Sequence, residues 1–203
     1  TPERFLDEEG NVLPYMEAVR SGLSVGVPGN IALAAKAHAA HGKLGWATLF
    51  DPAIRLAREG FEMNPRLHGM LERAKNRSAH TEEARALFFD AAGNPLPVGT
   101  RLTNERLART FEAIAAAGPR AFYTGSLARE IAETVSADTP RDGAMSYADI
   151  TGYEAKTRDG VCGTYRAYRI CTMGPPTSGG IAVLQILGQL ERFDLTALGV
   201  DNP

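Results

Sequence analysis

Residues 173–181 read Met-Gly-Pro-Pro-Thr-Ser-Gly-Gly-Ile and join two segments of different character. The stretches 155–161 and 165–172 before them are β-prone, which favours a hairpin that turns at the Cys-Gly-Thr sequence of 162–164. Residues 181–190 after them are apolar on nearly every side, which is typical of a buried helix. This succession of hairpin, loop and helix decides the fold class, and we expect an α/β (α+β) protein.

Upstream of these residues the sequence predicts several helices with clear start and stop signals. Asp51 is expected to cap the helix over 51–60 and Ser126 the last helix of this region, and glycines or prolines end several others. The other expected helices cover 30–41, 51–60, 66–75, 81–88 and 104–117. We therefore expect a helical region over residues 1–140, and the hairpin and buried helix over 141–203. Two strands alone are marginally stable, so the hairpin is expected to belong to a larger sheet.

The composition excludes several classes of protein. The 203 residues carry 22 Lys and Arg against 24 Asp and Glu, a net charge of −2, whereas a nucleic-acid-binding surface needs a basic excess. No stretch reaches the roughly 20 apolar residues of a membrane span. The opening residues, Thr-Pro-Glu-Arg, do not resemble a signal peptide.

Two cysteines, Cys162 and Cys171, are too few for a disulfide framework. With a hairpin turn at 163–164, Cys162 would pair near Tyr165 and Cys171 would face Lys156. The two thiols would then lie apart along the ladder, so we expect no bridge between them.

The sequence Thr177-Ser178-Gly179-Gly180 is the best candidate for a functional site. Backbone N–H groups at a helix start can hold a carboxylate or stabilise an oxyanion. Ser178 as a nucleophile would need a positioned base, and all four histidines lie far upstream. We therefore expect Ser178, Gly179 and Gly180 to form part of a pocket wall, with a rigid turn and a serine cap as the alternative.

Metal and nucleophile alternatives are weaker. His38 and His41 share a helix face but lack a third ligand, and His68 and His80 add no motif, so no metal site is expected. An N-terminal threonine can act as a nucleophile with its own amine as base, but Thr1 is followed by proline and has no nearby apolar strand.

The glycine-rich stretch Gly26-Val27-Pro28-Gly29-Asn30 superficially resembles a phosphate-binding loop. It lacks the Gly-Lys-Ser/Thr ending and the spacing of a dinucleotide fingerprint. A tight turn that packs a helix closely is the preferred interpretation.

Several motifs, in the same order along the chain, resemble the γ-glutamyltransferase family. They are Ser-Val-Gly-Val-Pro-Gly at 24–29, His-Gly-Lys-Leu at 41–44 with Trp46, Phe-Asp-Pro-Ala-Ile-Arg-Leu-Ala at 50–57 with Glu-Gly-Phe at 59–61, Gly-Pro-Arg-Ala-Phe-Tyr at 118–123 with Gly125, Met-Ser-Tyr-Ala-Asp-Ile at 145–150 with Tyr153, Gly-Thr-Tyr-Arg at 163–166, and the 173–181 stretch. The resemblance covers nearly the whole chain.

The resemblance implies an N-terminal-nucleophile hydrolase with a four-layer αββα sandwich and no cofactor. Such a precursor cuts itself into two subunits, and the threonine that begins the small subunit attacks a γ-glutamyl amide such as glutathione. This chain matches the middle and later part of the large subunit. The family's nucleophile and substrate-carboxylate arginine have no counterpart in it, so no catalytic residue is assigned. The family also implies a small-subunit partner and a periplasmic or extracellular location.

Other functions remain open at this stage. Gly174, Thr177 and Gly45 depart from the family pattern, which leaves room for a cephalosporin acylase-like or poly-γ-glutamate-cleaving relative. A non-enzymatic helical interaction module is a further alternative. The isolated chain is expected to be inactive and to associate with itself through the surface that a missing partner would cover. An unpaired hairpin edge and exposed apolar side chains on 181–190 would indicate that surface.

Overall fold

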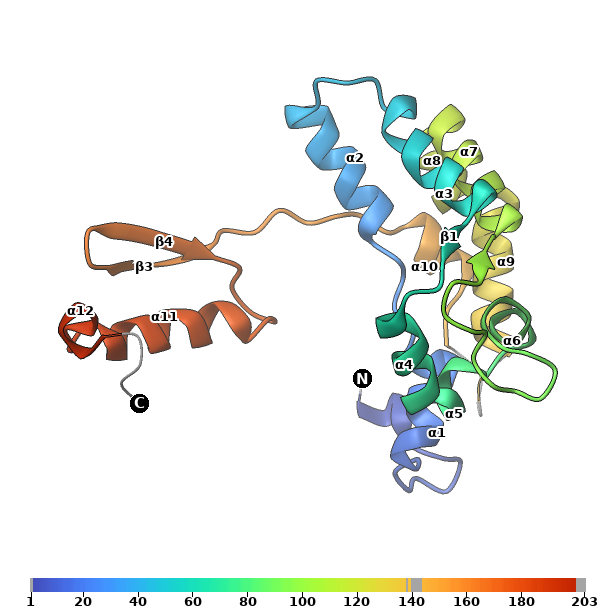
Figure 1. Ribbon diagram of the computed structural model, residues 1–203, viewed down its shortest axis with the longest axis horizontal. Helices are drawn as coiled ribbons and strands as arrows, with labels where there is room; N and C mark the ends of the chain where they lie inside the picture. Colours follow the sequence, from blue (N-terminus) through green and yellow to red (C-terminus); the bar gives the residue numbers. More distant parts are fainter. Residues whose placement is uncertain (1, 138, 140–143, 200–203) are drawn as a thin grey trace. The chain divides into compact units, whose positions relative to one another are not determined.

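The computed structural model describes residues 2–137, 139 and 144–199. They form two compact units, a helical unit over 1–155 and a hairpin unit over 156–203 (Figure 1). The units divide after Ala155, later in the chain than the boundary at residue 140 expected from composition.

The helical unit consists of short helices and one small sheet. Strands β1 and β2 pair antiparallel, with Phe61 opposite Leu102. In chain order its elements are η1 Pro2–Phe5, α1 Tyr15–Arg20, η2 Gly22–Ser24, α2 Asn30–His41, η3 Ala47–Phe50, α3 Asp51–Glu59, β1 Phe61–Glu62, α4 Pro65–Arg73, α5 Lys75–Ser78, α6 Glu82–Phe88, β2 Arg101–Leu102, α7 Glu105–Ala117, α8 Arg120–Tyr123, α9 Gly125–Ala137 and α10 Tyr147–Thr151.

Most predicted helices are confirmed, and two expected caps are wrong. Asn104 caps α7, because its side chain accepts a hydrogen bond from the N–H of Leu107. Asp51 lies inside α3 instead of capping it, because the 3₁₀ turn η3 already leads the chain into the helix. Ser126 is also inside its helix, since α9 begins at Gly125.

The boundary between the two units lies after residue 155 because α10 packs in the helical unit. Ser146 caps this helix, and its hydroxyl accepts from the Asp149 N–H while the Asp149 carboxylate accepts from the Ser146 N–H. The cap turns the helix so that Ile150 is fully buried with Tyr123 of α8 and Ala128 of α9. Residues 144–155 therefore complete the core of the helical unit.

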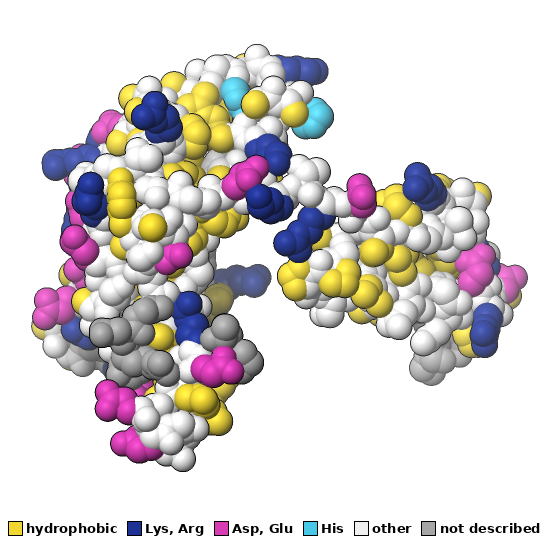
Figure 2. Space-filling model, turned by 180° about the vertical axis from the view of Figure 1, so that it is seen from behind, with side chains coloured by type: hydrophobic (Ala, Val, Ile, Leu, Met, Phe, Trp, Pro, Cys, Tyr) yellow, Lys and Arg dark blue, Asp and Glu magenta, His cyan; other side chains and the backbone are white. Residues whose placement is uncertain are grey.

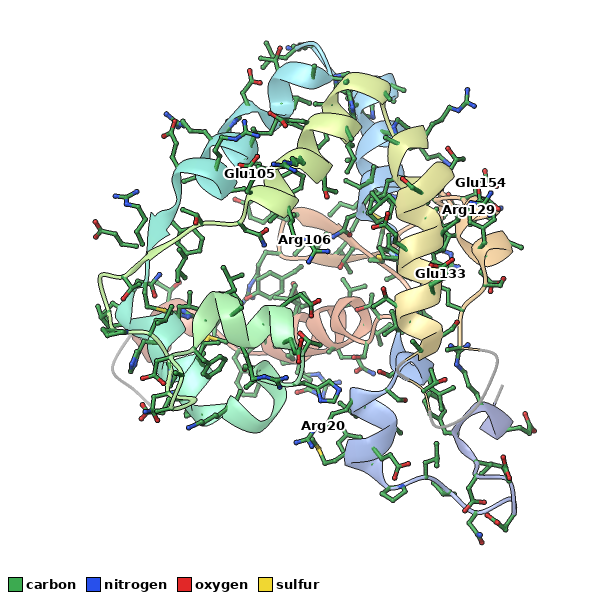
Figure 3. The ribbon with its side chains drawn as sticks, turned by 90° about the vertical axis from the view of Figure 1, so that its right-hand side faces the viewer. Arg20, Glu105, Arg106, Arg129, Glu133 and Glu154 are labelled. Atoms are coloured by element: carbon green, nitrogen blue, oxygen red, sulfur yellow. A yellow bond between two sulfur atoms is a disulfide. The ribbon has the colours of Figure 1, made fainter. Side chains whose placement is uncertain are left out.

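Helices α3 and α7 lie side by side, and an arginine clamps them together. The Arg58 guanidinium donates to the carboxylates of Glu105 and Glu112, at 3.0 and 2.8 Å (Glu105 is labelled on α7 in Figure 3). These hydrogen bonds hold the pKa of both carboxyls below their ordinary value. The indole N–H of Trp46 donates to the Ile114 carbonyl of α7 and fixes η3 on the same helix.

The hairpin unit corrects the expected register. Strands β3 Val161–Tyr165 and β4 Tyr168–Thr172 pair around a turn at residues 166 and 167, not at 163–164. Arg166 adopts φ 54°, and its backbone N–H donates to the Glu191 carboxylate, which stabilises this left-handed residue. Because the turn lies three residues later, Cys162 faces Cys171 and the two form a disulfide. The expectation of no bridge was wrong for this reason.

Helix α11 Gly179–Leu190 packs on the hairpin, and α12 Leu195–Leu198 follows it. Leu184 lies over Gly163, where an added Cβ would be 3.1 Å from Leu184 Cδ2.

The prediction that α11 is buried is wrong in this chain. Ile181, Val183 and Ile186 are 41, 45 and 55% exposed, and Gly180 alone among its described residues is buried (Figure 2 shows hydrophobic side chains at the surface of this unit). A two-stranded sheet is too narrow to cover an apolar helix. Among the described residues β3 and β4 pair only with each other, so the unpaired edge and exposed helix expected of an incomplete sheet are both present.

Candidate functional site

The first turn of α11 contains a glycine, Gly180, where a larger side chain would displace neighbouring atoms. Gly180 is buried, and an added Cβ would overlap the Met173 carbonyl oxygen and lie 2.8 Å from Thr172 Cγ2. The end of β4 therefore approaches the first turn of α11 directly. The hairpin thereby fixes the position of the 177–180 loop.

Ser178 and Gly179 lie on the open side of this turn, and both are exposed. The Ser178 side chain makes no capping hydrogen bond, while its carbonyl accepts from the Ala182 N–H at 2.9 Å. The first N–H groups of a helix have no partner within it, and the dipole of a 12-residue helix adds partial positive charge there. The site can therefore accept an anionic group from solvent.

The hairpin unit offers Ser178 no histidine as a general base. All four histidines precede residue 156, so the hairpin unit contains none. The alternative in which Ser178 acts as a nucleophile therefore gains no support from its surroundings.

Of the two histidines on α2, His38 serves packing. The His38 ring bonds the Leu44 carbonyl through Nε2 at 2.8 Å and meets Trp46 edge-on at 5.5 Å. His41 is exposed at the end of the helix. Over the part of the chain that the structure describes, no three His, Cys, Asp or Glu side chains gather as a metal site would require.

The 26–30 stretch is a close packing point, as predicted. An added Cβ at Gly29 would lie 2.9 Å from Cζ of Tyr153 and would overlap its hydroxyl. Tyr153 stacks on Tyr123 at 5.8 Å, and the Tyr123 hydroxyl donates to the Pro28 carbonyl and accepts from the Ala32 N–H. Burial raises the pKa of the Tyr123 hydroxyl above its ordinary value.

Beside this tyrosine pair lies an open hollow of about 420 Å³ that sequence reasoning missed. Lys36 and Arg120 line it together with the two tyrosines, and Lys36 donates to the Ala155 carbonyl at 2.8 Å. Both tyrosines belong to the motifs quoted above, which was the signal that could have drawn attention to this hollow. Thr1, the remaining candidate, lies outside the described residues.

Comparison with known proteins shows the family to which this chain belongs. The family model for gamma-glutamyltranspeptidase matches residues 1–203, the full length of the chain. The chain belongs to the gamma-glutamyltranspeptidase family. The resemblance found in its motifs is thereby confirmed, and its relatives are enzymes.

Two relatives show how far the similarity extends. The chain is 34% identical over 200 residues to the glutathione hydrolase proenzyme of Bacillus subtilis (strain 168), covering 98% of this chain and 33% of the relative. The gamma-glutamyltranspeptidase of Helicobacter pylori matches in structure with a TM-score of 0.85 at 33% identity, over 99% of this chain and 56% of the other. The helices and hairpin thus belong to the expected N-terminal-nucleophile hydrolase fold.

The chain spans about a third of the length of the curated relatives it matches. The acylase alternative also has a representative among them. The chain is 34% identical over 183 residues to the acylase ACY 1 proenzyme of Pseudomonas sp. (strain V22), covering 90% of this chain and 32% of the acylase.

None of the helices among the described residues has the length and hydropathy of a membrane span.

Proposed function

We propose that this chain is part of the large subunit of a self-processing γ-glutamyltransferase or glutathione hydrolase. In this proposal Ser178, Gly179 and Gly180 form one wall of the γ-glutamyl pocket. The observation that carries it is the 34% identity to a glutathione hydrolase proenzyme along nearly the whole chain, together with an exposed helix start in the hairpin unit.

The proposed reaction divides one difficult step into two. The threonine hydroxyl that begins the small subunit attacks the γ-carbonyl of the donor while its own α-amine takes the proton. The tetrahedral intermediate expels the donor's amine and leaves a γ-glutamyl ester. Water or an acceptor amine then attacks this ester and restores the threonine hydroxyl. None of these reacting groups is assigned to residues 1–203.

The contribution of this chain is to hold and orient the donor. The N–H groups at the start of α11 suit the free carboxylate of a γ-glutamyl group, because both the unpaired donors and the helix dipole favour an anion. Gly179 has open space at its Cβ position, with its nearest neighbour, Thr177 Oγ1, 3.8 Å away. A ligand can therefore approach the backbone closely at this residue.

The proposed location is outside the cytoplasm, in the periplasm or the extracellular medium. The Cys162–Cys171 disulfide supports it, because disulfides persist in oxidising compartments and are rare in the cytosol. The proposed partners are a γ-glutamyl donor and the small subunit of the same precursor.

The experiment that tests the pocket wall is a Gly179→Val substitution in the parent protein, with Gly188→Ala as its control. Both glycines are exposed on α11 and have no neighbour closer than 3.8 Å. If Gly179 faces the donor, Gly179→Val raises KM for γ-glutamyl-p-nitroanilide about tenfold, a loss of about 1.4 kcal/mol of binding. The control should leave KM unchanged. Unchanged kinetics in both variants would remove Gly179 from the pocket.

The similarity to the acylase ACY 1 proenzyme favours one second candidate, hydrolysis of an acyl amide that is not γ-glutamyl. The same purified parent protein distinguishes the two candidates. Release of p-nitroaniline from γ-glutamyl-p-nitroanilide supports the first, and cleavage of a cephalosporin side-chain amide without it supports the second.

A further inference from the structure

The disulfide of the hairpin unit lies on the side of the hairpin that α11 leaves open. Side chains alternate between the two faces of a strand, and in β3 Gly163 faces Leu184 of α11. Cys162 and Cys171 therefore lie on the other face, and both residues are exposed. Solvent therefore reaches both residues of the disulfide.

The two sulfur atoms have different electrostatic surroundings. Nη2 of Arg169 lies 3.6 Å from Sγ of Cys162, and Arg169 is two residues before Cys171 on β4, on the same face of the hairpin. No such contact is found at Cys171 Sγ among the residues that the structure describes. A nearby guanidinium lowers the pKa of a thiol and stabilises its thiolate. Because a thiol of lower pKa leaves faster in disulfide exchange, Cys162 is the better leaving group.

We propose that Cys162–Cys171 is an exchangeable disulfide that reacts with low-molecular-weight thiols, with Cys171 as the point of attack. An external thiolate attacks Cys171 Sγ and forms a mixed disulfide with it. The Cys162–Cys171 bond breaks, and Cys162 leaves as a thiolate that Arg169 stabilises. A second external thiolate attacks the external sulfur of the mixed disulfide, releasing Cys171 as a thiolate and the external thiol as its oxidised dimer. Two electrons pass from the two external thiols to the protein disulfide.

The exchange alters the support of the 177–180 loop. A two-stranded hairpin is marginally stable alone, and this disulfide joins its strands at the pair next to Gly163 and Ile170, six residues before the loop begins at 177. Opening it loosens the strand that ends against Gly180. The thiol reactivity itself does not depend on γ-glutamyl chemistry.

The test maps which cysteine carries the external thiol. The full chain is incubated at neutral pH with reduced glutathione or with 2-mercaptoethanol, free thiols are trapped with N-ethylmaleimide, and peptides are analysed by mass spectrometry. We expect the external thiol on Cys171 and the maleimide on Cys162, with an initial preference of about threefold, the effect of one pKa unit at a reacting thiol. Uncharged 2-mercaptoethanol should show the same preference, because the leaving group causes it.

The matched variants are Arg169→Gln and Arg158→Gln, two exposed arginines of the same unit. Arg169→Gln should slow attack on Cys171 about threefold and abolish the preference, while Arg158→Gln changes neither. An external thiol mainly on Cys162, an equal distribution in the unsubstituted chain, a preference seen with glutathione alone, or no exchange at all would each overturn the proposal.

Discussion

The side chain at position 180 is limited to a hydrogen atom by the backbone of Met173, the residue that follows β4. A methyl group there overlaps the Met173 carbonyl oxygen, whereas one at Gly188, on the same helix, meets no atom within 4 Å. Gly180→Ala should therefore destabilise the hairpin unit by about 1–3 kcal/mol, and Gly188→Ala should stabilise it by about 0.5–1 kcal/mol. Urea denaturation followed by circular dichroism measures both. Equal effects of the two substitutions would contradict the packing described here.

The Ser146–Asp149 cap predicts a local stability change. Ser146→Ala removes the acceptor of the Asp149 N–H and should cost about 1 kcal/mol, since a serine cap contributes about that much. Ser126→Ala is the control, because Ser126 lies exposed in the first turn of α9 and makes no capping contact. Thermal unfolding should show a lower Tm for the first variant alone.

The same cap predicts a dependence on pH. The N–H of Ser146 is the main cause of the lowered pKa of Asp149, whose ordinary value is 3.8. Because the folded state prefers the ionised carboxylate, this contribution is complete above that value and is lost as pH falls through the lowered pKa. Asp149→Asn should therefore reduce the acid sensitivity of unfolding below pH 4, measured by denaturation at a series of pH values. An unchanged pH profile would show that Asp149 does not contribute.

At the scale of elements, the Arg58 clamp between α3 and α7 is exposed and should respond to salt and acid. The hydrogen bonds from Arg58 lower the pKa of Glu105 and Glu112, so their contribution is present above the ordinary value of 4.5 and is lost as pH falls through the lowered pKa values. Arg58→Gln should lower Tm at pH 7 and low salt, with a smaller effect in 0.5 M salt. An effect equally large at both salt concentrations would contradict an electrostatic clamp.

Sequence patterns predicted the local elements better than their pairing. Helix α2 occupies the predicted residues 30–41 because its boundaries depend on local signals. The hairpin register depends on Glu191, 25 residues from the turn it stabilises at Arg166, and no local pattern contains that contact. The disulfide was missed for the same reason, since one shift of the turn changes every cross-strand partner.

At the scale of the whole molecule, the apolar face of α11 predicts association. Ile181, Val183 and Ile186 lie exposed on a helix whose sheet has two strands among the described residues. The isolated chain should form dimers or larger species at high concentration, since large exposed apolar patches favour contact. Sedimentation velocity at increasing concentration measures this, and Ile186→Gln should weaken it. A strictly monomeric chain at high concentration would contradict the prediction.

The motifs predicted the family because their order extends along the whole chain, from Ser24 to Ile181. The 177–180 loop and the helix after it were predictable, since a proline-rich turn before a helix is a local signal, and the role of Ser178, Gly179 and Gly180 as a pocket wall stays a prediction. The hollow beside Tyr123 and Tyr153 was not, because α2, α8 and the residues after α10 form it together. Helix α11 is exposed because the two-stranded hairpin is too narrow to cover it. Its apolar composition alone predicted burial.

The most direct test of the proposed function is to express the parent reading frame and determine the N-terminal sequence of each product. We expect two subunits: a larger one that contains this chain, and a smaller one that begins with threonine and is required for γ-glutamyl-p-nitroanilide hydrolysis. The isolated 203-residue chain should show no turnover above a blank. Turnover by that chain, abolished when its α-amine is blocked, would contradict a nucleophile in the small subunit and make Thr1 the nucleophile.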